Sequence, residues 1–407
     1  MTASFPAPMS SFGIRPEAEF APASGIVEVA NYGRGRPGLI PLWIGEGDRP
    51  TPAFIADAAT RSLAAGETFY TWQRGIPELR EAIARYQERL LGVPFDPERF
   101  YVTVGGMHAL LMAARIVAGA GDEVLVPTPA WPNFEGALAL AGARAISVPM
   151  SVGAAGWILD LDRLEAAVTP RTRAICINSP SNPTGWTASH DELARILGLA
   201  RRHGLWIIAD EIYQRFVHDP GLTAPGGRAA SFHDVMKPDD RVLFLQTFSK
   251  NWAMTGWRIG WLEAPASLGS VIENLVQYST SGVAGFLQRA AVTALDQGEA
   301  LVAEHVALAR RNREIVCSGL ARTGVVHLPP PPGAFYAFFS VEGVADTRQL
   351  ALDLIDHANV GLAPGTAFGP GGSAHLRLCY LRDTAMVQDA VERLGDALPE
   401  LARAKAA

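Results

Sequence analysis

The stretch RVLFLQTFSKNWAMTGWRIGW at residues 241–261 decides how this chain folds. It opens with a short apolar run, which is typical of a strand buried on both faces of a parallel sheet. The run ends at Ser249 and Lys250, among aromatic and uncharged neighbours. Only two other lysines, Lys237 and Lys405, occur among the 35 basic residues of the chain. A desolvated lysine has a lowered pKa and becomes a nucleophile toward an aldehyde, so Lys250 is the first candidate for chemistry.

The segments before this stretch alternate between helical patterns and short apolar runs. A helical pattern covers residues 51–91, and another begins after Ser189, which precedes Glu192 at the spacing of a capping box. We expect strands at residues 99–104, 122–127, 143–150, 172–178 and 205–210. This order predicts an α/β fold: a large domain over residues 51–285, in which a mostly parallel sheet carries helices on both faces.

Residues beyond 285 follow a different pattern. One long helix is expected to reach Arg322, and four prolines then precede a strand at 333–341. The remaining expected elements are a helix near 347–358, a strand at 375–380 and a final helix from Asp383. This order predicts a smaller α+β domain over residues 286–407. Residues 1–50 are rich in Pro and Gly, and we expect an irregular segment that packs with the smaller domain.

The composition argues against several classes of protein. With 48% hydrophobic and 19% charged residues among 407, the chain is expected to be globular. The net charge of −6 is spread along the chain, so we expect neither nucleic acid nor a membrane as a partner. Neither a signal peptide nor a membrane-spanning run is recognisable, and three scattered cysteines fit reduced thiols and a cytoplasmic location. No Cys or His spacing suggests a metal site.

Unusual residues gather where the predicted strands end. Ligands of open α/β sheets bind at the carboxyl ends of the strands, so residues that follow the strands closely are expected to share one site. The residues concerned are Gly105, Gly106, Trp131, Asn182, Asp210 and Lys250.

Two of these positions suggest the kind of ligand. A carboxylate at Asp210 that faced a pyridine nitrogen would keep that nitrogen protonated and make the ring an electron sink. The pair Gly105-Gly106 before a helix would offer free N–H groups and the positive end of the helix dipole to a phosphate. Each feature also has a plainer interpretation: Asp210 as a cap or ion-pair partner, the glycines as a tight turn, and the nearby Arg258 as a buried structural arginine.

Eight segments between about residues 42 and 394 resemble, in order, the class I/II aminotransferases. These are pyridoxal-phosphate enzymes of fold type I, the group that includes aspartate aminotransferases. NPTG, DEIY and the run from SK to RIG are the most specific parts of the match. The segments are IGEGDRPTP, FYTWQRGIPELREAI, VTVGGMHAL, NSPSNPTG, ADEIY, TFSKNWAMTGWRIGW, PPGAFYAF and HLRLCY.

The resemblance implies a role for each matching residue around the cofactor. Lys250 resembles the lysine that forms a Schiff base with pyridoxal 5'-phosphate and shuttles the substrate proton. Asp210 resembles the partner of the pyridine nitrogen, and Trp131 resembles the aromatic ring that stacks on the pyridine. Tyr213 and Asn182 resemble the groups that hydrogen-bond the phenolic oxygen of the cofactor. The implied phosphate site comprises Gly105, Gly106, Met107, Ser249 and Arg258.

The resemblance also implies how substrate and a second subunit take part. Arg377 resembles the arginine whose planar fork clamps the substrate α-carboxylate, with Gly45, Asn182 and Trp131 beside it. Tyr70 resembles a residue that reaches the cofactor phosphate of the neighbouring subunit. The chain is therefore expected to form a homodimer with shared active sites.

The implied reaction moves an amino group between an L-amino acid and a 2-oxo acid by a ping-pong mechanism. Some aspartate-specific relatives carry a lysine where this chain has Met107. The donor therefore stays open between aspartate and an apolar or aromatic amino acid. Arg49 and Arg74 are the candidate partners of a distal carboxylate.

Three other functions compete with this interpretation. A β-lyase or a cyclopropane-carboxylate-type synthase on the same fold would use the same residues. The effector domain of a regulator would need a DNA-binding domain, for which residues 1–50 offer too little length. A nicotinamide dehydrogenase finds support only in GRGRPG at residues 33–38, where no strand precedes the glycines and Pro37 favours a loop.

Overall fold

The computed structural model describes residues 13–14, 18, 22–153 and 156–406 and is built around a seven-stranded sheet. The strand order is β2-β12-β11-β8-β7-β3-β4, and every pair is parallel except those of β12, which runs antiparallel to β11 and β2. The mostly parallel sheet is therefore confirmed, although the sequence patterns did not predict β12. The strands are β2 (Phe100–Thr103), β3 (Glu123–Thr128), β4 (Arg144–Pro149), β7 (Thr172–Asn178), β8 (Trp206–Asp210), β11 (Val242–Thr247) and β12 (Gly260–Glu263).

Apolar side chains cover both faces of this sheet. In β8, Ile207 and Ala209 pack into one apolar cluster and Ile208 packs into another, because successive side chains point to opposite faces. Helices α5, α6 and α9 complete the second cluster, and α7 and α8 contribute to the first. The bounds are α5 (Gly105–Val117), α6 (Asn133–Leu140), α7 (Leu161–Ala166), α8 (His190–His203) and α9 (Gly269–Gln277). The capping box predicted at Ser189 and Glu192 opens α8.

Residues 51–91 form two helices joined by a loop. The expectation of one continuous helical stretch there is wrong, although both parts are helical. The helices are α3 (Ala53–Ala64) and α4 (Pro77–Leu91), and Gly66 and Gly75 in the loop between them have positive φ values of 78° and 98°. Such a φ is unfavourable for other residues and incompatible with a helix. A Cβ at Gly75 would also collide with Val102, which the local pattern cannot reveal.

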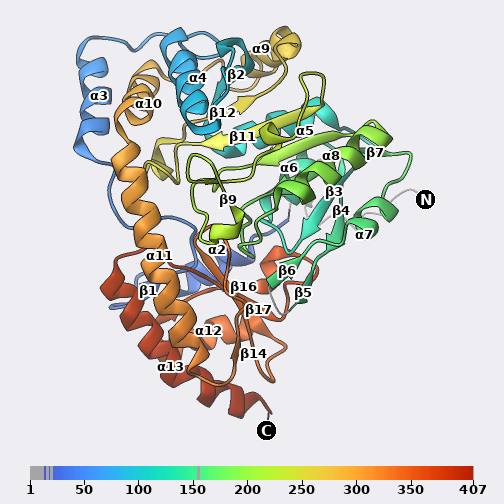
Figure 1. The fold of residues 1–407 in the computed structure, drawn as a ribbon. Helices are drawn as coiled ribbons and strands as arrows, with labels where there is room; N and C mark the ends of the chain where they lie inside the picture. Colours follow the sequence, from blue (N-terminus) through green and yellow to red (C-terminus); the bar gives the residue numbers. More distant parts are fainter. Residues whose placement is uncertain (1–12, 15–17, 19–21, 154–155, 407) are drawn as a thin grey trace.

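The long helix expected after residue 285 is likewise divided, into α10 (Gly285–Gln297) and α11 (Glu299–Ala321). Gly298 lies between them with φ −90° and ψ 8°, and a Cβ at this position would collide with the carbonyl oxygen of Ala294 and the ring of Trp252. Helix α10 packs against α3 and α4, whereas α11 runs away from them and lies beside α13 (Thr384–Ala406) (Figure 1).

The C-terminal region holds a second, antiparallel sheet in the order β13-β14-β17-β16. Helix α12 (Thr347–Ala358) packs against β16 and β17 of this sheet and against α13. The strands are β13 (Val326–His327), β14 (Tyr336–Val341), β16 (Ala363–Pro364) and β17 (His375–Cys379). Two short hairpins, β5 (Ser151–Gly153) with β6 (Gly156–Ile158) and β9 (Thr223–Ala224) with β10 (Arg228–Ala229), lie outside both sheets.

The described part of residues 1–50 is more regular than expected. Helix α2 (Gly25–Gly33) begins at Ser24, whose hydroxyl accepts a hydrogen bond from the N–H of Val27, and packs against α12. Strand β1 (Ile40–Pro41) pairs in parallel with β15 (Val360–Gly361). These elements lie against the C-terminal region, while the division of the chain at residue 285 stays a prediction.

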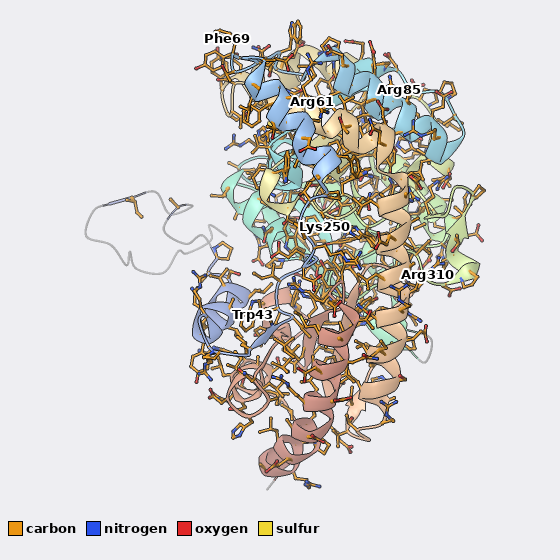
Figure 2. All side chains as sticks on the ribbon, turned by 90° about the vertical axis from the view of Figure 1, so that its left-hand side faces the viewer. Trp43, Arg61, Phe69, Arg85, Lys250 and Arg310 are labelled. Atoms are coloured by element: carbon orange, nitrogen blue, oxygen red, sulfur yellow. The ribbon has the colours of Figure 1, made fainter. Side chains whose placement is uncertain are left out.

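The two sheets place the candidate residues between them. Lys250, just beyond the carboxyl end of β11, lies near the middle of the molecule in Figure 2, between the upper region of α3 and the lower region of α13. Arg377 approaches the same place from β17. None of the described helices is both long and apolar enough to cross a membrane.

Candidate active site

A cavity of about 360 Å³ lies at the carboxyl edge of the large sheet, closed on one side by β14 and β17. It brings together eleven of the thirteen residues predicted for the site. These are Gly45, Gly106, Met107, Trp131, Asn182, Asp210, Tyr213, Ser249, Lys250, Arg258 and Arg377. Gly105 lies next to the cavity wall, and Tyr70 lies elsewhere.

The amine of Lys250 is held inside this cavity. Its Nζ donates a hydrogen bond of 2.6 Å to the carbonyl of Gly45. Desolvation lowers the pKa of Lys250 to about 8, so roughly a tenth of the amine is uncharged at pH 7, far more than for an ordinary lysine. Lys237 is exposed in a turn, and the side chain of Lys405 lies outside the described residues. Lys250 is thus a lysine that lines the cavity and has a lowered pKa.

Asp210 ends β8 with a carboxylate that lacks a strong partner. The side chain is 3% exposed, and within the described residues it accepts one hydrogen bond, of 3.3 Å, from the N–H of Ile212. Burial raises the pKa of Asp210 to about 7. A buried carboxylate that faces a cavity with most of its acceptor sites unused fits a ligand with a protonated ring nitrogen.

Two tyrosines meet beside this carboxylate. The hydroxyl of Tyr213 lies 2.7 Å from that of Tyr336 in β14, and both rings are buried. Asn182 also lines the cavity. Its Oδ1 accepts a 2.9 Å hydrogen bond from Arg377, and its backbone N–H donates to the side-chain oxygen of Asn178. The sequence analysis missed Tyr336 and Asn178, although both stand in segments that carried the resemblance.

The start of α5 forms one end of the cavity. Gly105 has a φ of +71°, and a Cβ there would lie 2.7 Å from the guanidinium of Arg258. Ser249 contributes a hydroxyl, which accepts a 2.9 Å hydrogen bond from Thr247. A helix N-terminus, a hydroxyl and a guanidinium together suit a phosphate group, so this end fits the phosphate of the cofactor. Thr247, which also lines the cavity, was not predicted.

Arg377 provides a second guanidinium group in the wall of the cavity, in addition to that of Arg258. Its side chain is 2% exposed and lies over the rings of Tyr336 and Phe368, with its guanidinium carbon 4.8 and 5.0 Å from their centroids. It donates to Asn182 and to the carbonyl of Trp43, whereas its Nε is without a partner among the described residues. A buried guanidinium with a free donor suits a carboxylate ligand.

Apart from Gly105, which lies beside the cavity wall, three predicted or candidate residues do not line this cavity. Tyr70 is 94% exposed and lies on another surface, beside a shallow cavity lined by residues 67–71 and 280–286. Arg49 forms a surface ion pair with Glu304, and Arg74 forms ion pairs with Glu98 and Glu273. The expectation that one of these arginines reads the substrate side chain therefore finds no support within this chain.

The wall near Met107 is mostly apolar instead, and it includes the amide of Asn133, which donates a 3.0 Å hydrogen bond to the Met107 sulfur. Ile26 and Val27 of α2, together with Ile44, line the cavity along with Met107 and Trp131. Their contribution was missed because residues 1–50 were expected to be irregular. Within the described residues, no group of three or more His, Cys, Asp or Glu side chains is arranged to hold a metal ion.

Comparisons with known proteins agree with this geometry. A family model described as "Aminotransferase class I and II" matches residues 37–394. The chain is 34% identical over 364 residues to the aspartate/prephenate aminotransferase of Thermus thermophilus, covering 88% of this chain and 91% of that protein. It is 33% identical to aromatic-amino-acid aminotransferase 2 of Thermococcus litoralis over 386 residues, or 94% and 97% of the two chains.

A solved structure gives the same result. The aromatic aminotransferase from Pyrococcus horikoshii superposes with a TM-score of 0.82 at 33% identity, covering 92% of this chain and 99% of that one. Both the sequence match and the fold therefore extend over nearly the whole chain. The chain belongs to the class I and II aminotransferases, pyridoxal-phosphate-dependent enzymes of fold type I that move an amino group between an amino acid and a 2-oxo acid.

Proposed function

We propose that this aminotransferase binds its cofactor covalently through Lys250 and prefers an amino donor with an apolar or aromatic side chain. The observation that carries the assignment of the site is the buried Asp210 carboxylate, which has one weak partner and faces the cavity that holds the Lys250 amine. Bound pyridoxal phosphate supplies an aldehyde that captures amines and a ring that draws in electrons.

The residues of the chain would share the remaining work. Lys250, with its Nζ free, would take the α-proton of the substrate and return it on the far side of the transferred nitrogen, at the carbon two bonds from the α-carbon. Asp210 would keep the ring nitrogen protonated, and Tyr213 would donate its hydroxyl proton to the phenolic oxygen of the cofactor. Arg377 would bind the α-carboxylate through its fork, and Trp131 would hold the ring from one face. Hydroxyl and N–H groups at the start of α5 and at Ser249, with Arg258, would hold the phosphate.

The preference for an uncharged donor follows from the cations of the cavity. Those among its described lining residues are Lys250, Arg258 and Arg377, and each already has a role. A second carboxylate beside Met107 would be left without a cationic partner, and an unpaired buried charge is costly. The names of the relatives do not decide which amino donor is preferred, because one relative is named for aspartate and prephenate and another for aromatic amino acids.

A homodimer completes the proposal. Phe69, Tyr70, Trp72 and Tyr278 expose between 62% and 94% of their surface. The segments that carry them lie side by side, since Gln73 donates a 2.7 Å hydrogen bond to Gln277. Figure 2 shows Phe69 at the upper edge of the molecule, away from Lys250 and Trp43. An exposed aromatic face of this kind suits a second copy of the chain, and Tyr70 would then serve the partner's site. The three free cysteines fit a cytoplasmic enzyme.

A half-reaction screen tests the donor preference. The loaded enzyme is mixed with phenylalanine, leucine or aspartate, and the formation of pyridoxamine phosphate is followed for each. We expect kcat/KM for phenylalanine to exceed that for aspartate by roughly tenfold or more, and Met107→Lys to narrow this ratio. A preference for aspartate in the unaltered enzyme would contradict the proposed donor class. With a fourth donor that carries a leaving group on its β-carbon, such as an S-substituted cysteine, release of ammonia without pyridoxamine phosphate would favour the lyase alternative.

A further inference from the structure

The hydroxyl of Tyr336 occupies a position that the assigned roles do not explain. It is fully buried, it lies 2.7 Å from the hydroxyl of Tyr213, and both tyrosines line the cavity. Tyr336 belongs to β14 of the small sheet, whereas Tyr213 follows β8 of the large sheet. The bond therefore joins the two sheets at the point where the cofactor is expected.

The surroundings fix the direction in which this hydroxyl points. A Cβ on Gly45 would collide with the Tyr336 oxygen, so the hydroxyl lies directly against the backbone whose carbonyl accepts from Lys250. The Tyr213 ring crosses the Tyr336 ring edge to face, with centroids 5.6 Å apart. The guanidinium of Arg377 covers the face of the Tyr336 ring. The ring is thus held in place by contacts on several sides, and its hydroxyl is left one good partner, Tyr213.

The chemistry of two hydroxyls in contact decides which of them donates. The proposed role of Tyr213 is to donate its proton to the phenolic oxygen of the cofactor, which leaves only its oxygen lone pairs for Tyr336. The single proton of Tyr336 must then go to Tyr213. Hydrogen bonds arranged in such a chain polarise one another, so the donor at the end becomes stronger.

We infer that Tyr336 is a positioning residue, which donates to Tyr213 and strengthens the hydrogen bond that Tyr213 makes to the phenolic oxygen of pyridoxal phosphate. This inference rests on the proposed role of Tyr213. A hydrogen bond to the charged form of a phenol lowers its pKa and weakens its hold on a nearby proton. Tyr336 therefore shifts the protonation of the bound cofactor toward lower pH without touching the reacting atoms. The other titratable or charged groups near Tyr336 are Asp210, Arg377 and Cys379.

The test is a pH titration of the absorbance of the bound cofactor in the unaltered loaded enzyme and in four variants. Tyr336→Phe should raise the midpoint by roughly half a pH unit or more, about the effect of one net hydrogen bond. Tyr213→Phe should raise it further, and the double variant should match Tyr213→Phe alone, because Tyr336 acts through Tyr213. Tyr380→Phe is the matched control, since this buried tyrosine has its hydroxyl near His218 and outside the cavity lining, and its midpoint should stay unchanged.

The outcomes separate this inference from the proposed function. A midpoint unchanged in Tyr336→Phe but raised in Tyr213→Phe would overturn the inference and leave the site assignment intact, as would two shifts that add in the double variant. If Tyr213→Phe itself leaves the midpoint unchanged, the proposed role of Tyr213 is wrong and the inference falls with it. Thermal unfolding of each variant shows whether the fold is retained.

Discussion

Two buried acids stand next to each other in this chain and meet different surroundings. Asp210 faces the cavity with a single weak hydrogen bond, whereas Glu211 points into a polar cluster on the other side of the sheet. There the Glu211 carboxylate accepts from the hydroxyl of Ser231 at 2.7 Å and from the N–H of Phe232 at 3.0 Å. Burial raises the pKa of each acid to about 7.

The difference shows which property marks a ligand site. A raised pKa is common to both acids, so it does not by itself distinguish a functional carboxylate from a structural one. The hydrogen-bond capacity of Glu211 is met within the protein, and the neighbouring His233 is likewise paired with Glu263. Asp210 keeps unused acceptor sites that point toward a space large enough for a cofactor. A buried carboxylate with unused hydrogen-bond acceptor sites beside a cavity is therefore a better indicator of a ligand site than a raised pKa.

The largest effect is expected at Lys250. In Lys250→Ala the amine that moves the proton is absent, and kcat should fall by about 10²–10⁴-fold or more, the usual contribution of a positioned base. Lys237→Ala, which removes an exposed lysine, should leave kcat within about twofold of the unaltered enzyme. Steady-state rates with a good amino donor measure both. Equal losses in the two variants would mean that the cavity lysine has no special role.

A smaller but more discriminating effect is expected when the two acids are exchanged for their amides. Asp210→Asn should lower kcat by roughly 10²-fold, because the ring nitrogen loses its charged partner, and should leave stability unchanged or improved. Glu211→Gln should keep kcat within about tenfold but lower the free energy of unfolding by about 1–3 kcal/mol, since a satisfied network is broken. Rates and chemical denaturation are measured on both variants. The comparison fails if the two residues exchange these phenotypes.

Tyr70 differs from both acids, because it is exposed and lies outside both the cavity and the polar cluster around Glu211. A mixture of Tyr70→Ala and Lys250→Ala subunits should recover about one quarter of the normal activity, because half of the dimers are hybrids and each hybrid has one complete site. Each variant alone should be much less active. Native mass spectrometry establishes that subunits have exchanged. Absence of recovery in exchanged dimers would show that Tyr70 serves its own chain.

The smallest effect concerns the stability of the cofactor-free protein. A carboxyl group whose pKa rises from 3.8 to about 7 on folding binds more protons when folded, so its ionisation destabilises the fold as pH rises through that interval. The unaltered protein should therefore lose about 2–4 kcal/mol of stability relative to Asp210→Asn between pH 4 and pH 7, and no more above it. Denaturation at several pH values measures this difference. A difference that does not vary with pH would show that Asp210 is not an uncompensated buried acid.

Much of this arrangement could be predicted from sequence because it depends on local patterns. Apolar runs located the strands, and the residues that follow them, such as Asp210 and Lys250, do share one cavity. The separation of α10 from α11 at Gly298 was not predicted. A side chain at Gly298 would collide with the ring of Trp252, and a local sequence pattern cannot reveal that contact. Strand β12 was not predicted because it has only four residues, GWLE, and this short segment, which begins with a glycine, shows no clear strand pattern.

The missed members of the site have a shared physical reason. Tyr336 and the apolar residues of α2 approach the cavity from elements outside the large sheet, so the rule about strand ends does not apply to them. Tyr336 did stand in the quoted segment PPGAFYAF, where a tyrosine among buried aromatic residues was the available signal. The candidate arginines Arg49 and Arg74 lie outside the cavity of this chain, where partners far away in sequence, Glu304 and Glu273, form ion pairs with them. Their contact with substrate stays a prediction.

Covalent trapping of the cofactor tests the central assignment most directly. The enzyme purified with pyridoxal phosphate is reduced with borohydride, digested, and the labelled peptide is identified by mass spectrometry. The assignment predicts that the label lies on Lys250, within the peptide that contains TFSKNWAM. A label on Lys237, or a reduced enzyme that carries the cofactor on no lysine, would contradict it.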